Sequence, residues 1–150
     1  MKRIGVSILT AIALMLLATA VPAAAETRMY RATFVEIGGD NGTGSSCGSG
    51  TISGMGHVAN QCIQFDACGI NCHERTIEFE DGSSVLIVES VVGVITHGDS
   101  TGFLEITQRI VEGTGRFEGA TGSGTGLVNL NAGAVIVASG TITLPDDDQD

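Results

Sequence analysis

A glycine-rich stretch, Gly113-Thr-Gly-Arg-Phe-Glu-Gly-Ala-Thr-Gly-Ser-Gly-Thr-Gly126, constrains the fold of this chain more than any other segment. Its only apolar side chains are Phe117 and Ala120, so it cannot supply the apolar face of an ordinary helix. Glycine adopts backbone angles closed to other residues and lets neighbouring backbones approach closely. We therefore predict a tight bend or a strand crossing at a barrel corner, with the glycines as its hinge and Phe117 as its plug.

Short β-strands with alternating polar and apolar residues are predicted on both sides of this segment. The run Thr76-Ile-Glu-Phe-Glu80 places Ile77 and Phe79 on one face, and the Asp81-Gly82 pair after it is a strong hairpin signal. Near the end of the chain, residues 134–144 place small and large apolar side chains on a single face. That mixture suits the inside of a narrow barrel.

Further strands are expected at 28–37, in one or two pieces within 50–65, and at 84–96, 103–111 and 127–131. The strand at 84–96 is apolar on both faces, so we expect it to be covered on both sides, or to face a lumen on one side and a partner on the other. A loop carrying cysteines is expected over 66–72. No convincing helical period follows residue 25. This pattern predicts an all-β, antiparallel barrel or sandwich of seven or eight strands, forming one domain over residues 26–145.

The first 25 residues have the organisation of a secretory signal peptide. Lys2 and Arg3 precede an apolar block over residues 4–17, and small residues follow up to Ala25. The apolar block is too short to span a bilayer comfortably, which disfavours a retained membrane helix. We expect a signal-peptide helix that is cleaved between Ala25 and Glu26, and a mature protein that is secreted to the extracellular space or the periplasm.

The charge of the mature chain excludes several classes of partner. Without Lys2 and Arg3, five arginines and no lysine remain against 17 acidic residues, so the formal charge falls from -10 to -12. Such a surface repels phosphate backbones and anionic membranes. The chain also has no tryptophan and one tyrosine for stacking on bases. We expect no nucleic acid or membrane partner, and a solvated, mobile acidic tail at 146–150.

Four cysteines lie after the expected cleavage site, and this even number indicates two disulfides in an exported chain. Four cysteines allow three pairings; the short loops favour Cys47 with Cys62 and Cys68 with Cys72. A metal site built from Cys62, Cys68, Cys72 and His73 is disfavoured because the spacing matches no common zinc pattern. We expect neither a metal nor a cofactor.

The segment from Glu112 to Gly122 resembles the Gly-Gly-Thr-Gly-x-Phe-x-x-Ala-x-Gly signature of dirigent proteins and allene oxide cyclase-like barrels, with Glu112 in place of the first glycine. The resemblance includes the two strands that follow the motif and implies an eight-stranded antiparallel barrel, lipocalin-like in shape, with an axial cavity. Plant members cyclise a fatty-acid epoxide or steer phenol coupling with acidic or polar residues in that cavity. None of those residues aligns here, so none is carried over. The motif residues are Gly113, Gly115, Phe117, Gly119, Ala120 and Gly122.

The densest group of ionisable side chains does not amount to a recognisable active site. A histidine with two carboxylates performs general acid and base chemistry where the groups converge in a lumen. Positions on the rim and outer face of a barrel explain the same residues more simply. The group comprises His57, Asp66, His73, Glu74 and Glu78.

Three functions remain open from the sequence. The first, which we favour, is non-catalytic binding of a small apolar ligand in the lumen or of a protein partner on the rim. The second is a cofactor-free isomerase or cyclase of the allene oxide cyclase type, which requires a polar residue buried in the lumen. The third is a structural or surface-adhesion module with a filled barrel. Because one fold hosts many functions, the side chains facing the barrel axis must distinguish them.

Overall fold

A computed structural model describes residues 25–37, 44–97, 100–132 and 134–145 of the chain. The expected signal peptide and the acidic tail therefore lie outside the described residues. Within the described part, no helix has the length and apolar character needed to cross a membrane.

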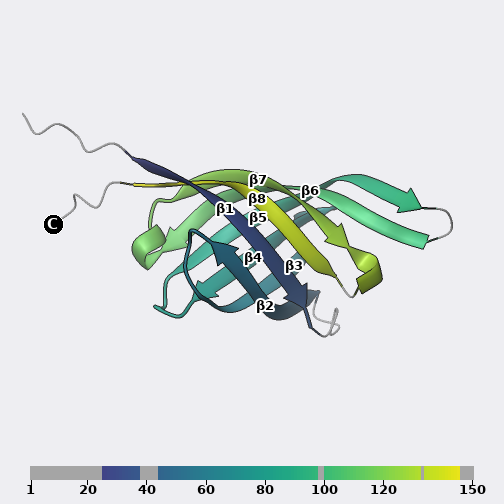
Figure 1. The fold of residues 1–150 in the computed structure, drawn as a ribbon, viewed down its shortest axis with the longest axis horizontal. Helices are drawn as coiled ribbons and strands as arrows, with labels where there is room; N and C mark the ends of the chain where they lie inside the picture. Colours follow the sequence, from purple (N-terminus) through teal and green to yellow (C-terminus); the bar gives the residue numbers. More distant parts are fainter. Residues whose placement is uncertain (1–24, 38–43, 98–99, 133, 146–150) are drawn as a thin grey trace, which may run out of the picture.

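Eight antiparallel strands form one closed barrel in which each strand pairs with its neighbour in the chain and β8 pairs back to β1 (Figure 1). The expectation of an all-β, eight-stranded antiparallel barrel is therefore confirmed. The strands are β1 (Glu26–Glu36), β2 (Ser45–Ser53), β3 (Val58–Gly69), β4 (Cys72–Phe79), β5 (Ser84–His97), β6 (Ser100–Thr114), β7 (Thr121–Asn129) and β8 (Val135–Leu144).

The pairing of β1 with β8 closes the barrel. It runs in continuous register from Glu26 opposite Leu144 to Val35 opposite Val135. The weakest part of the wall lies between β2 and β3, where the described pairing covers only Ser45 to Gly48. Beyond that point the two strands diverge, and the buried side chain of Met55 joins the core from the loop between them.

The core follows directly from the period of two residues in the strands. Alternate side chains of each strand point inward, as the burial pattern of β1 shows for Tyr30, Ala32 and Phe34. In β8 the inward positions are Ile136, Ala138 and Ile142, as the sequence predicts. Burying such side chains contributes about 1.5 to 3 kcal/mol for each large one. These side chains form one apolar cluster that holds the barrel together.

The glycine-rich segment forms the predicted corner only over its first half. A short 3-10 helix, η1 (Gly115–Phe117), turns the chain between β6 and β7, and Gly115 and Gly119 have positive φ angles of 59° and 73°. Phe117 is buried, as expected of a plug. From Thr121 onward the segment is strand β7, so the prediction of a bend up to Gly126 is wrong for its second half.

The glycines of β7 serve the core rather than the bend. Gly122, Gly124 and Gly126 occupy alternate positions, while exposed side chains occupy those between them. A Cβ on Gly124 would lie 2.3 Å from the hydroxyl oxygen of Tyr30, and one on Gly140 of β8 would lie 2.8 Å from it. These positions lack side chains because the Tyr30 ring lies over them: Gly140 is its register partner on β8, and Gly124 is the next residue of the same row on β7.

Arg116 of η1 fixes this corner to two other loops. Its guanidinium lies 4.5 Å from the ring centroid of Phe117 and donates hydrogen bonds to the Met55 carbonyl and, over 3.2 Å, to the Ser83 hydroxyl. Its Nε also pairs with Asp81 Oδ2 at 2.7 Å. The corner at η1 is thus joined to the loop between β2 and β3 and to the loop between β4 and β5.

Both predicted disulfides are present. Cys47 is bonded to Cys62 between the paired ends of β2 and β3, and Cys68 is bonded to Cys72 where β3 turns into β4. The expected loop over 66–72 is shorter than predicted, because β3 continues to Gly69 and β4 begins at Cys72. Two disulfides are typical of proteins that fold in an oxidising environment.

Candidate functional site

A chain of buried polar side chains crosses the interior of the barrel. Each of them is at most 3% exposed, although each carries a group that is costly to bury without a partner. In order of contact they are Tyr30 of β1, Gln108 of β6, Glu89 of β5, Arg75 of β4 and Gln61 of β3.

Arg75 is the centre of this chain. Its Nε and Nη2 donate to the two carboxylate oxygens of Glu89 at 2.9 and 3.1 Å, and Nη2 also donates to Glu36 at 3.0 Å. Nη1 donates to the side-chain oxygen of Gln61. The guanidinium lies 5.1 Å from the ring centroid of Phe34. All three guanidinium nitrogens are therefore engaged.

The chain continues from Glu89 to the opposite wall. Gln108 donates to Glu89 Oε1 over 2.7 Å, and its own amide oxygen accepts from the Tyr30 hydroxyl over 2.9 Å. Burial, together with the negative charge of Glu89, raises the pKa of Tyr30 to about 12. Burial acts to lower the pKa of Arg75, but the charges and hydrogen bonds of Glu89 and Glu36 outweigh it and the pKa is raised. Arg75 therefore stays charged and Tyr30 stays protonated at neutral pH.

Sequence reasoning missed this chain because its members lie far apart in the sequence. One signal was available: in β4, Arg75 is in phase with the inward residues Ile77 and Phe79. Glu89 likewise continues the inward positions of Val85 and Ile87. Alternation alone therefore places both charges inside, but it cannot show that they meet.

The ionisable group singled out from the sequence does not converge on one site. In β4, Glu74 directly precedes the inward residue Arg75, and Glu78 lies between the inward residues Ile77 and Phe79, so both glutamates face outward. His57 is exposed in the loop between β2 and β3. Of this group, only Asp66 and His73 come together.

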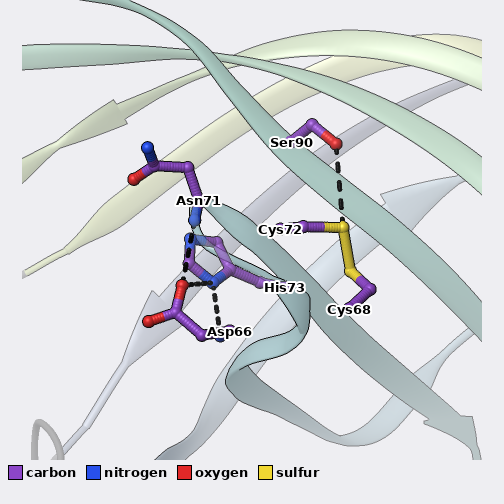
Figure 2. The surroundings of a disulfide bond; sticks show 6 residues. All are labelled: Asp66, Cys68, Asn71, Cys72, His73 and Ser90. Carbon is purple, nitrogen blue, oxygen red and sulfur yellow. Dashed lines mark hydrogen bonds and ion pairs between the residues drawn. A yellow bond between two sulfur atoms is a disulfide. The ribbon is translucent and has the colours of Figure 1, made fainter.

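Asp66 and His73 stabilise the turn that is closed by the Cys68–Cys72 disulfide (Figure 2). The backbone N–H of Asp66 donates to His73 Nδ1 over 2.9 Å, and Asp66 Oδ1 accepts from the backbone N–H of Asn71 over 3.0 Å. Asp66 and Asn71 both have positive φ angles, 53° and 60°. These hydrogen bonds stabilise a turn in which two non-glycine residues have positive φ angles. A structural role is therefore sufficient to explain why Asp66 and His73 lie together. Within the described residues, no three His, Cys, Asp or Glu side chains are grouped as metal ligands.

A broad hollow of about 1650 Å³ lies on the outside of the barrel and is open to solvent. We call it the wall hollow. Its floor is formed by β2, β1, β8, β7 and β6, with Val92 of β5 at one side and His57 with Glu80 at the other. The exposed side chains along its floor are outward positions of the strands, and many of them are hydroxyls. They include Thr33, Thr51, Ser53, Thr107, Thr125 and Ser139.

The wall hollow also contains apolar and charged side chains. Val92, Leu127 and Val137 are 62%, 44% and 56% exposed, respectively. Arg31 and Glu105 are its charged residues on the floor strands. The strand expected at 84–96 is therefore not covered on both sides over its second half, where Val92 is open to solvent. The alternative, a lumen on one side and a partner on the other, stays a prediction.

Comparisons of the chain with family models, with curated proteins and with solved structures gave no match.

Proposed function

We propose that this protein is an exported, non-catalytic binding protein whose binding site is the wall hollow on the outside of the barrel. The arrangement of two disulfides and an acidic, lysine-free mature surface agrees with a role outside the cell. Because the interior of the barrel is occupied by its own side chains, its outer surface is the part that remains available for binding.

The interior gives little support for a ligand along the axis. The Tyr30 ring lies over Gly140 and Gly124, its register neighbours on β8 and β7, and its hydroxyl reaches Gln108 of β6. The ion pair of Arg75 with Glu89 occupies the part of the interior next to β4 and β5. A ligand would have to displace groups that are hydrogen-bonded to one another, which leaves buried polar groups unpaired at a cost of about 1 to 3 kcal/mol each.

One observation supports the isomerase alternative, namely the buried carboxylate of Glu89. A general base needs a free lone pair directed at a substrate. Both oxygens of Glu89 already accept hydrogen bonds from Arg75, and one accepts another from Gln108. We therefore favour binding over catalysis.

The wall hollow is the observation that carries the proposal. Its volume of about 1650 Å³ exceeds that of an ordinary small-molecule pocket, which is roughly 300 to 1,000 Å³. It is also open along one side of the molecule rather than enclosed. Such a shape suits an extended ligand or another macromolecule better than a small apolar molecule.

The test is the binding of the labelled mature protein to cell-envelope and matrix material from the organism that exports it. The variants Thr125→Arg and Ser139→Arg place a long charged side chain on the floor of the hollow and should reduce binding at least tenfold. Thr76→Arg, on the exposed outer face of β4, is the matched control and should bind normally. Equal binding by all three variants would contradict the proposal, as would saturable uptake of a fluorescent fatty acid by the native protein.

A further inference from the structure

We propose that the wall hollow binds a neutral polysaccharide chain. This inference rests on the proposed function and specifies its ligand. It is drawn from the regular placement of hydroxyl, apolar and planar charged side chains across neighbouring strands.

The hydroxyl groups form a row across the floor of the hollow. Strand pairing places Thr107 opposite Thr125, Thr125 opposite Ser139, Ser139 opposite Arg31, and Arg31 opposite Ser53. Neighbouring strands lie about 4.8 Å apart, so the row presents a polar group at each such step. The hydroxyls of Thr107, Thr125 and Ser139 can both donate and accept, which allows them to pair with the hydroxyls of a sugar in either direction. The Ser53 hydroxyl is already bonded to the backbone of Arg31.

A second, parallel row is partly apolar. Glu105, Leu127, Val137, Thr33 and Thr51 follow one another across the same five strands. Sugars have polar edges and apolar C–H faces. A ligand with this double character fits a surface on which a hydroxyl row lies beside exposed Leu127 and Val137.

Arg31 is available to a ligand. Arg28, Arg75 and Arg116 each form an ion pair, whereas Arg31 has no ion pair within the described residues, and its backbone makes the contacts to Ser53. A guanidinium is a planar fork that donates two parallel hydrogen bonds, which matches two adjacent sugar oxygens.

Glu105 complements Arg31: the guanidinium donates hydrogen bonds to sugar oxygens, whereas the two carboxylate oxygens of Glu105 accept hydrogen bonds from sugar hydroxyls. Glu105 lies on β6, and Arg31 lies on β1, three strand spacings or about 14 Å across the sheet and a further two residues along the strand. A ligand that contacts both residues is longer than one sugar ring. The hollow therefore favours a chain over a monosaccharide.

The charge and composition of the hollow disfavour other ligands. Glu80 and Glu105 line it, and the chain carries a net charge of -10, so an acidic polymer is repelled. The lining has no aromatic residue, whereas the centres of protein interfaces are enriched in Tyr, Trp and Phe. A neutral hydroxyl-rich chain carries no charge for these carboxylates to repel.

The test uses the mature protein in affinity electrophoresis and isothermal titration calorimetry. The probes are soluble α-glucan, β-glucan and mannan, their mono- and trisaccharides, and alginate as the acidic polymer. We expect at least one neutral polymer to bind, more tightly than its trisaccharide, with no detectable binding of its monosaccharide or of alginate.

Variants assign the binding to the hollow. Arg31→Gln and Glu105→Gln should each weaken binding of the neutral polymer at least tenfold, and Thr125→Val should weaken it several-fold while keeping the β-branched shape. Arg109→Gln, an exposed residue of β6 outside the hollow, should bind like the native protein. Circular dichroism and thermal unfolding check that each variant is folded.

The outcomes separate the two proposals. Neutral polymer that binds equally well to the Arg31 and Glu105 variants overturns the inference, and so does binding of alginate alone. Envelope binding that depends on Thr125 and Ser139 but is destroyed by protease and resists periodate also overturns it, while leaving the proposed function intact. Envelope binding that is indifferent to Thr125 and Ser139 removes both.

Discussion

A single arginine organises the polar interior of this barrel. Arg75 is buried among apolar side chains, and its charge is tolerated because Glu89 and Glu36 neutralise it and Gln61 accepts a further hydrogen bond. A buried ion pair contributes little more to the free energy of unfolding than well-packed apolar residues would. Removing one partner is costly, however, because the other charge then stays buried without a counter-charge.

Replacing Arg75 alone should therefore be severe. Arg75→Met leaves the Glu89 carboxylate buried without its cation, and we expect a loss of about 3 to 5 kcal/mol in the free energy of unfolding, measured by urea denaturation. The double variant Arg75→Met with Glu89→Gln should recover part of that loss. Arg31→Met, at an exposed position, is the control and should change stability by less than about 0.5 kcal/mol. A mild effect at Arg75 would contradict the paired, buried arrangement.

Tyr30 makes the stability of the protein depend on alkaline pH. Its pKa is raised from 10.0 to about 12 in the folded state, so between these values the unfolded chain loses a proton that the folded protein keeps. Stability is therefore fully present below pH 10 and falls as the pH rises toward 12, by about 2 to 3 kcal/mol in total.

Because the chain has only one tyrosine, ultraviolet absorbance of tyrosinate follows this residue alone. The native protein should ionise near pH 12 and the urea-unfolded protein near pH 10. Tyr30→Phe should abolish the part of the stability loss that occurs in this window. Ionisation of the folded protein at the ordinary value would show that Tyr30 is not buried beside Glu89.

Among the elements, β7 is notable because three successive inward positions, Gly122, Gly124 and Gly126, carry no side chain, whereas the next one, Val128, packs against the core. Its glycines leave room for Tyr30 and for the backbone of β8. Gly124→Ala would place a Cβ 2.3 Å from the Tyr30 hydroxyl and 2.6 Å from the Ser139 carbonyl oxygen. We expect a loss of about 1 to 3 kcal/mol from overpacking, measured by thermal or urea unfolding.

Ser123→Ala is the matched control for Gly124→Ala, since Ser123 is the preceding residue and faces outward. It should leave stability within about 0.5 kcal/mol of the native value. Equal stability of the two variants would contradict the inward orientation of the β7 glycines.

The two disulfides should differ in their contribution to stability. Cys47 and Cys62 are separated by 15 residues in sequence, and Cys68 and Cys72 by four. In the chain-entropy model the longer loop restrains the unfolded chain more, by about 1 kcal/mol. Replacing Cys47 and Cys62 with alanine should therefore lower the unfolding free energy more than replacing Cys68 and Cys72. The reverse order would show that the short loop stabilises the fold through native contacts around Asp66 and His73.

At the scale of the whole molecule, closure distinguishes this fold from an open sheet. β1 pairs with β2 on one side and with β8 on the other, so residues 31–35 have strand partners on both sides. In hydrogen exchange, their amides and those of 135–139 in β8 should be among the slowest. Residues 51–53 of β2, which lie beyond the pairing with β3, should exchange faster. Rapid exchange along β1 and β8 would indicate an open edge.

Much of the architecture could be predicted from local patterns. The Asp81-Gly82 hairpin, the inward face of β8 and the two short-loop disulfides each depend on residues close together in the chain. The corner at η1 was predicted for the right reason, namely the need for positive φ at glycine. The error at Gly122 to Gly126 arose because inward glycines in a strand look the same in the sequence as glycines in a bend.

The strand period, the turns and a preference among the three possible cysteine pairings could be derived from the sequence alone, because they depend on residues that are near neighbours in the chain. Only the tertiary structure decided that Arg75, Glu89 and Tyr30 meet inside, and that hydroxyls from five strands line one outer hollow. The physical reason is that register and closure bring together residues as far apart as Tyr30 and Gln108, and no local pattern encodes that distance.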